Sequence, residues 1–200
     1  MPMPTSNASA ASPFVIRPAR EEDADAIGLA HVQAWQQEYR GTMPDAYLDG
    51  LRAEDRADGW RRSLASPDAG RRLLVAAVDI AIDAAADDVV GFVAFGGCRD
   101  EPLPGDDHAD DDEVDGELFA VNLAPRAWGR GIGRALVRAA GDGLTELGHH
   151  TAVLWVVPGN ARARGLYESE GWETDGGARE FELYGVLVPE VRYRRSLSRP

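Results

Sequence analysis

The chain has 200 residues, of which 44% are hydrophobic, and this length and composition suit a single domain with a sizeable core. Its formal net charge of −13 disfavours nucleic acid as a partner, because a nucleic-acid-binding face is expected to be basic. No apolar run approaches the roughly 20 residues that span a bilayer. The single cysteine, Cys98, excludes an internal disulfide and disfavours a structural zinc site. We therefore expect a cytoplasmic protein that binds no metal, no membrane and no nucleic acid.

The composition of the sequence divides it into a tail, a domain and a loop within that domain. Residues 1–13, "MPMPTSNASAASP", lack the basic and apolar regions of a secretory signal and predict a disordered tail. Residues 14–197 are expected to form one domain. Within it, residues 100–116 are rich in Asp and Glu and predict a solvated acidic loop.

The hydrophobic pattern predicts alternating strands and helices. Short apolar runs are typical of buried strands, and apolar residues three or four positions apart are typical of one helix face. We expect strands at 14–19, 71–80, 88–97, 116–125, 151–157, 180–184 and 191–197, and helices at 21–39, 44–51, 54–65, 131–147 and 160–170. This order predicts an α/β fold with a mixed sheet.

Three glycines crowd the start of the clearest helix, in "WGRGIG" at residues 128–133. Glycine disfavours a helix interior by about 1 kcal/mol relative to alanine. Unpaired N–H groups at a helix start, with the helix dipole behind them, can bind a phosphate. No Lys-Ser/Thr pair follows, and the G-x-G-x-G spacing misses the dinucleotide fingerprint. A phosphate site and a tight turn that allows close packing both remain open at this point.

A second segment, "NARARGLYESEGW", follows the apolar strand that ends at Val157. Asn160 stands at a helix start, and Tyr167 follows two turns later, so the two side chains project from one face about 10 Å apart. Asn160 also suits an ordinary helix N-cap, and Tyr167 an ordinary core aromatic with a satisfied hydroxyl.

Together the two segments resemble the GNAT superfamily of coenzyme A-dependent N-acetyltransferases. The family signature is Arg/Gln-x-x-Gly-x-Gly/Ala between a strand and a helix, then Asn-x-x-Ala-x-x-Leu-Tyr and a later Gly-aromatic pair. "WGRGIG" supplies the first part, with Trp128 in the Arg/Gln position. Because the phosphate contacts are expected from main-chain N–H groups, the site should tolerate this departure. The second part is matched by Asn160, Ala163, Leu166, Tyr167, Gly171 and Trp172.

The resemblance implies a single GNAT-like domain with a mixed central sheet of about six to seven strands, flanked by helices. Two central parallel strands, Glu117–Leu123 and Thr151–Val157, would splay apart to admit acetyl-CoA. The pyrophosphate would rest on the amides of the glycine segment, and the pantetheine arm on the end of the first strand. The implied cofactor-binding residues are Val121, Leu123, Gly129, Arg130, Gly131, Ile132, Gly133, Arg134 and Asn160.

The same resemblance implies direct attack of an amine on the thioester, with no metal and no covalent acyl-enzyme. Tyr167 is the predicted acid that protonates the departing thiolate. Glu117 is the predicted base. The alternative interpretation is that Glu117 is only the last member of the acidic loop. Trp35 and Tyr39, one turn apart on the first helix, either line the acceptor pocket or pack in the core.

We thus predict an N-acetyltransferase that moves an acetyl group from acetyl-CoA to a primary amine on a small molecule or peptide. A cationic acceptor is expected if the acidic loop flanks the acceptor entrance. The alternatives are a coenzyme A-binding module without turnover and a transferase for another acyl-CoA. The protein is expected to be a monomer or a homodimer.

Overall fold

The computed structural model describes residues 14–65, 70–78, 88–99, 116–183 and 185–197. The predicted N-terminal tail and all but the last residue of the predicted acidic loop lie outside these ranges. Within the described residues, no helix is long and apolar enough to cross a membrane.

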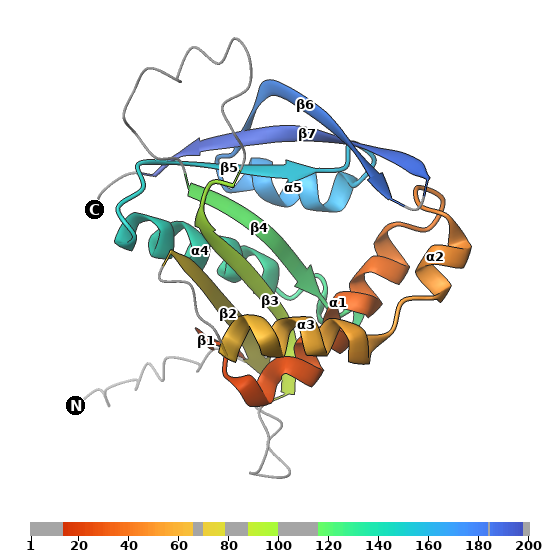
Figure 1. Cartoon of the computed structure of the whole chain (residues 1–200). Coiled ribbons are helices and arrows are strands. Elements are labelled where there is room, and N and C mark those ends of the chain that lie inside the picture. Colours follow the sequence, from red (N-terminus) through yellow and green to blue (C-terminus); the bar gives the residue numbers. More distant parts are fainter. Residues whose placement is uncertain (1–13, 66–69, 79–87, 100–115, 184, 198–200) are drawn as a thin grey trace, which may run out of the picture.

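The described residues form one α/β domain, and every predicted strand and helix is found (Figure 1). The strands are β1 (Phe14–Pro18), β2 (Arg71–Val78), β3 (Asp88–Gly97), β4 (Gly116–Leu123), β5 (Thr151–Val156), β6 (Glu173–Leu183) and β7 (Val186–Ser196). The α-helices are α1 (Ala24–Glu38), α2 (Asp45–Asp49), α3 (Ala53–Ala65), α4 (Ile132–Glu146) and α5 (Ala161–Ser169).

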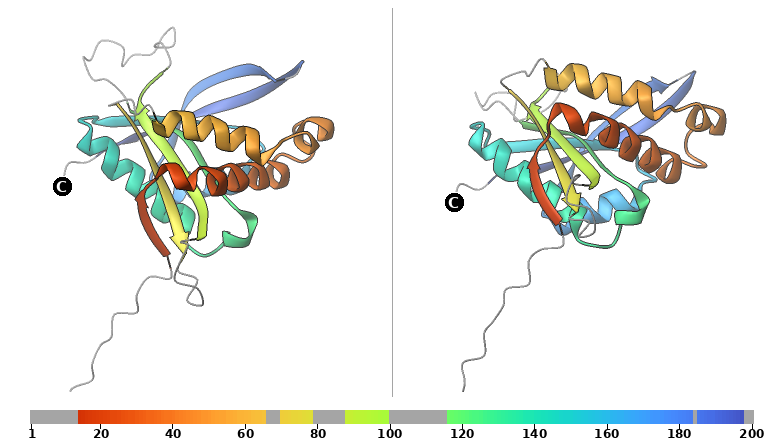
Figure 2. Two further views of the ribbon diagram at one scale, coloured as in Figure 1. Left: turned by 60° about the horizontal axis from the view of Figure 1, so that its bottom comes forward. Right: turned by 90° about the horizontal axis from the view of Figure 1, so that it is seen from below.

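The seven strands form one mixed sheet in the order β1-β2-β3-β4-β5-β7-β6, which confirms the predicted fold class. All neighbours are antiparallel except β4 and β5. Helices α1 and α3 cover one face, and α4 covers the other (Figure 2). The main core lies between the sheet and α4, where the buried face of the helix carries Leu136 and Leu144.

The two parallel strands separate soon after they meet. They pair only through Gly116 with Ala152 and Glu117 with Val153. Beyond that point β4 continues along β3, while β5 continues along β7. A bulge leaves Phe119 as an extra residue in β4, and a bulge bends the strand that carries it. The predicted splay of the central strands is therefore present.

Strands β6 and β7 are longer than predicted, at 11 residues each. The sequence analysis predicted only one part of each strand, at 180–184 and 191–197. The missed part of β6, residues 173–179, carries charged side chains and two glycines, and the missed part of β7, residues 186–190, contains Pro189, which weakens a strand pattern. Pairing with the partner strand of the hairpin extends both strands through these residues.

Helices α1 and α3 touch through their backbones at one glycine. A Cβ atom on Gly28 would lie 2.5 Å from the carbonyl oxygen of Ala53 and 2.7 Å from the nitrogen of Ala57. Distances this short are repulsive, so only glycine allows α3 to lie this close to α1.

We expect Gly28→Ala to destabilise the protein by roughly 1–3 kcal/mol, because the added methyl must push α3 away from α1. Thermal unfolding followed by circular dichroism measures this change. Gly59→Ala in α3 is the matched control, because a Cβ there meets only Arg62, at 4.0 Å. The control should be neutral or stabilising, since alanine favours a helix. A Gly28→Ala variant as stable as its control would contradict the close approach.

Candidate active site

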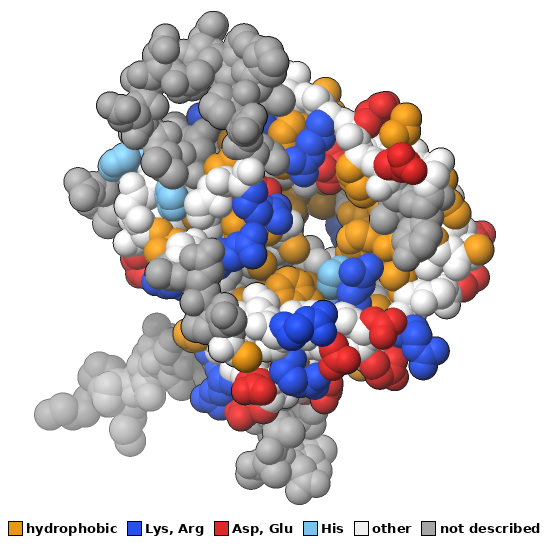
Figure 3. All heavy atoms as spheres, viewed as in Figure 1, with side chains coloured by type: hydrophobic (Ala, Val, Ile, Leu, Met, Phe, Trp, Pro, Cys, Tyr) orange, Lys and Arg blue, Asp and Glu red, His pale blue; other side chains and the backbone are white. Residues whose placement is uncertain are grey.

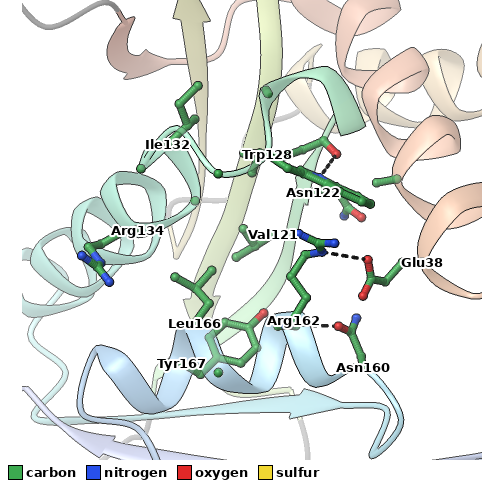
Figure 4. Close-up of a pocket in the computed structure, with 18 of the residues that line it drawn as sticks. Glu38, Val121, Asn122, Trp128, Ile132, Arg134, Asn160, Arg162, Leu166 and Tyr167 are labelled. Atoms are coloured by element: carbon green, nitrogen blue, oxygen red, sulfur yellow. Dashed lines mark hydrogen bonds and ion pairs between the residues drawn. The ribbon is translucent and has the colours of Figure 1, made fainter.

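A cleft of about 550 Å³ opens where β4 and β5 separate (Figure 4). Its walls come from the end of α1, the end of β4, the glycine segment before α4, and α5. Most of the residues that the sequence singled out meet here. The predicted residues that line the cleft are Val121, Leu123, Gly129, Gly131, Ile132, Gly133, Arg134, Asn160 and Tyr167.

The glycine segment has unusual backbone geometry. Gly129 and Gly131 have φ of 73° and 79°, in the left-handed region that favours glycine, and Gly131 is the N-cap of α4. A Cβ on either residue would meet nothing within 4 Å, so these two glycines do not serve close packing. Gly133 differs, because a Cβ there would lie 3.3 Å from Leu166 of α5.

The N–H groups of this segment are available to a ligand. The first backbone hydrogen bond at this end of α4 runs from the Ala135 N–H to the Gly131 carbonyl, at 3.1 Å. Within the described part of the chain, no N–H of residues 129–134 donates to a backbone carbonyl. With the positive end of the α4 dipole behind them, these donors have the chemistry that an anion site requires.

Asn160 links two walls of the cleft. Its side-chain oxygen accepts a 2.9 Å hydrogen bond from the Ala163 N–H and so caps α5, as one of the two interpretations predicted. The same side chain lies close to the phenol of Tyr39 on α1. Asn160 therefore stands where the start of α5 meets the end of α1.

Tyr167 combines the two roles that its sequence context allowed. Its ring is buried near Trp172 and Tyr193, with centroid distances of 6.3 and 6.4 Å. Its hydroxyl points into the cleft, where no described residue hydrogen-bonds to it (Figure 4). Burial, with a smaller contribution from Tyr39, raises the pKa of the Tyr167 phenol above its ordinary value. The phenol is therefore protonated at neutral pH.

Glu117 lies outside the cleft-lining residues, at the last point where β4 still pairs with β5. Its side chain is 2% exposed, and its carboxylate accepts three hydrogen bonds from Arg99. The donors are the backbone N–H at 3.1 Å, Nε at 3.2 Å and Nη2 at 2.7 Å. The structure therefore does not bring Glu117 next to Tyr167, and its role as base stays a prediction. Arg130 is exposed and also does not line the cleft.

Trp128, in the position where the resemblance expected Arg or Gln, takes part in the cleft wall. Its indole N–H donates to the Leu123 carbonyl at 3.0 Å and so fixes the ring against the end of β4. The Arg162 guanidinium lies 4.0 Å from the centroid of the Trp128 ring and 3.5 Å from the Glu38 carboxylate (Figure 4).

Glu38 and Arg162 also line the cleft, and neither was among the predicted site residues. Glu38 directly precedes Tyr39, which was a candidate for the acceptor pocket, and Arg162 lies one turn before Leu166. Within the described residues, no group of three or more His, Cys, Asp or Glu side chains could hold a metal ion.

This geometry defines an α/β domain with a cleft between two separated parallel strands and unpaired N–H groups along one wall. The chain matches the acetyltransferase (GNAT) family model over residues 32–172, and it belongs to this family. It is 30% identical to the uncharacterized N-acetyltransferase YuaI of Bacillus subtilis, over 88% of this chain and 89% of that protein. The prediction of a GNAT acyltransferase is thus confirmed.

Solved structures share the fold at low sequence identity. The PaiA N-acetyltransferase of Thermoplasma acidophilum, in complex with coenzyme A, is 15% identical with a TM-score of 0.67. The match covers 92% of this chain and 98% of that one. YncA of Salmonella typhimurium, solved with its cofactor acetyl-CoA, is 18% identical with a TM-score of 0.61. That match covers 94% and 95% of the two chains.

We expect Gly131→Ala to weaken binding of coenzyme A about tenfold, because a side chain in the left-handed region costs roughly 1–2 kcal/mol and displaces the amides around it. Isothermal titration calorimetry with coenzyme A measures the effect. Gly148→Ala is the control, since Gly148 also has a positive φ, of 94°, and does not line the cleft. Equal affinity in the two variants would contradict a phosphate-binding role for the glycine segment.

Proposed function

We propose that the protein transfers an acetyl group from acetyl-CoA to a primary amine by direct attack. One observation carries this proposal: the unpaired amides of residues 129–134 and the hydroxyl of Tyr167 face the same cleft. The structures of PaiA with coenzyme A and of YncA with acetyl-CoA support the choice of co-substrate, because the fold is shared.

The residues present suit this co-substrate, which supplies an activated acyl thioester. The amides of Gly129–Arg134 would hold the pyrophosphate, and the two positive-φ glycines leave its approach open. The pantetheine arm would follow β4 near Val121. It would also pass Leu123, whose carbonyl accepts one hydrogen bond from the Trp128 indole and has a second lone pair left.

Tyr167 would donate a proton to the departing sulfur. A thiol ordinarily has a pKa of about 8.5, and the pKa of a phenol is about 10. Burial raises the pKa of Tyr167 further, so the phenol is protonated at neutral pH but is a weaker acid than a thiol. The hydroxyl would therefore first donate a hydrogen bond to the sulfur as negative charge develops there, and the sulfur would take the proton as its bond to the acyl carbon breaks.

The acceptor amine must lose a proton before it attacks, since a free ammonium titrates near pH 10. Glu117 is the base that we propose, and this role requires Arg99 to move off its carboxylate. Glu38 is the acidic side chain among the described residues that line the cleft, and it would need release from Arg162.

Release of thiol from acetyl-CoA across an amine library tests the function itself. Turnover with at least one amine supports the proposal. Coenzyme A binding without any thiol release would instead favour a non-catalytic binding module. Faster release from a longer acyl-CoA would indicate another acyl donor.

We expect Tyr167→Phe to lower kcat by about 100-fold while leaving coenzyme A affinity unchanged, because only the proton donor is lost.

Wild-type activity should not decline up to about pH 10, since the raised pKa keeps the phenol protonated. Wild-type stability should fall above about pH 10, where the unfolded tyrosine ionises and the folded one resists it. The stability of the Tyr167→Phe variant should fall less steeply than that of the wild type over this pH range. Unchanged kcat would remove Tyr167 from the chemistry.

Glu117→Gln and Glu38→Gln, compared side by side, identify the base. The variant that removes the base should lose roughly 100-fold or more in kcat at neutral pH and recover partly at alkaline pH, where more amine is neutral. If a carboxylate has a purely structural role, its replacement should change the melting temperature and leave the pH dependence of kcat unchanged. If only Glu38→Gln loses this pH dependence, Glu38 is the base in place of Glu117.

A further inference from the structure

A row of aromatic side chains leads out of the cleft along α1. His31, Trp35 and Tyr39 follow each other one helical turn apart, with ring centroids 5.3 Å apart for the first pair and 5.2 Å for the second. Tyr39 lines the cleft beside Tyr167 and Asn160. Eight residues of helix span about 12 Å, so the row continues well beyond the reacting centre.

Arg56 of α3 lies over the middle of this row. Its Cζ atom is 5.6 Å from the centroid of the Trp35 ring, and its Nη2 donates to the Tyr47 hydroxyl at 3.2 Å. Within the described part of the chain, no carboxylate forms an ion pair with Arg56. The next arginine on α3, Arg61, is by contrast paired with both Asp25 and Asp58.

A partly buried guanidinium without a carboxylate partner is costly, because burial removes water that would otherwise solvate its charge. Arginine is also the side chain best suited to bind a carboxylate through two parallel hydrogen bonds. Its position over Trp35 therefore favours a ligand carboxylate as the missing partner.

His31, one turn before Trp35 on α1, carries a donor without a partner. Its Nδ1 accepts a 3.4 Å hydrogen bond from the Trp60 indole, which assigns the proton of a neutral ring to Nε2. Burial, and to a lesser extent Arg56, lowers the pKa of His31 to about 4, so the ring is neutral at physiological pH. The Nε2 atom is buried and has no hydrogen-bond partner.

These residues stand on the open face of the splayed strands. Trp35 and Tyr47 belong to an apolar cluster that also contains Phe181 and Val188 of the β6–β7 hairpin. The cluster thus joins the helical side of the opening to the hairpin side. Figure 3 shows a hollow at the centre of this face, with hydrophobic side chains on its walls and arginine side chains at its rim.

We propose that the acceptor is an amine that also carries a carboxylate, bound by Arg56 with the Nε2 hydrogen of His31 as a second donor. This inference rests on the proposed function, and it makes Arg56 a residue that determines acceptor specificity. The chain between amine and carboxylate would lie against Trp35. Trp35, over which Arg56 lies, is one turn, about 5 Å, from Tyr39 along α1, so the two groups of the acceptor are separated by several bonds.

The charge of this acceptor is the opposite of that expected from the acidic loop. That expectation depends on residues outside the described ranges. The described residues near the row of α1 instead present a guanidinium without a carboxylate partner, which selects an anionic group, and an unpaired N–H, which selects an acceptor, while the Glu38 carboxylate in the cleft is paired with Arg162.

The test compares acceptors that differ only at the end remote from the amine. 6-Aminohexanoate, hexylamine and 1,6-diaminohexane carry an anionic, a neutral and a cationic end on the same chain, and dipeptides with their amidated forms extend the series. Initial rates of thiol release give kcat and KM. Binding to the protein saturated with coenzyme A, followed by tryptophan fluorescence, gives a readout without turnover.

In the wild type we expect the carboxylate-bearing members to have kcat/KM or affinity about 10- to 100-fold above their partners. Arg56→Gln should abolish this preference through KM, with coenzyme A affinity and melting temperature unchanged, and Arg56→Lys should retain part of it. Arg62→Gln is the matched control, because it removes the same charge from an exposed position on α3 and should keep the preference.

A wild type that favours the neutral or cationic members, or an Arg56→Gln variant that keeps the preference, overturns the inference. Thiol release without any preference for a carboxylate would overturn it and leave the proposed function standing. Carboxylate-dependent binding that requires Arg56, without thiol release, would support the inference and count against the proposed function. Neither binding nor release for any member counts against both.

Discussion

The structure depends on the early separation of β4 from β5. Parallel neighbours in a sheet ordinarily continue to pair, because unpaired backbone groups in a protein interior are costly. Here two residue pairs join the strands, and each strand then follows its other neighbour, β3 or β7. The bulge at Phe119 bends β4, and the β4 edge beyond Glu117 faces the cleft instead of another strand. This edge is the place where a ligand can take the part of the missing strand.

A buried carboxylate joins α4 to α5, the two helices on either side of the cleft. Glu170, at the end of α5, binds Arg134 at 2.9 Å and Arg138 at 2.6 Å, both in the first half of α4. The glycine segment directly precedes α4, and Tyr167 lies one turn before Glu170. The ion pairs therefore fix the amides that would bind phosphate relative to the phenol. Asn160 and Tyr39 provide the corresponding link between α5 and α1.

Charge is distributed unevenly over a protein with a strongly acidic total. Arginines on the outer surface, such as Arg40 and Arg61, are matched by nearby aspartates. Arg56, which faces the aromatic row of α1, has no such match among the described residues. The net charge of −13 therefore says little about the sign of the charge that the acceptor meets.

The sequence by itself determined the features that depend on neighbours in the chain. The glycine segment, the cap at Asn160, the helices and most of the strands follow from backbone preferences and periodicity over a few residues. Tertiary structure decided whatever depends on distant partners. Glu117 binds an arginine 18 positions away, and Trp128 closes over the end of β4 while supporting Arg162. Neither Glu38 in the cleft nor the environment of Arg56 has a local signal, because each arises where separate helices meet, and only folding brings those helices together.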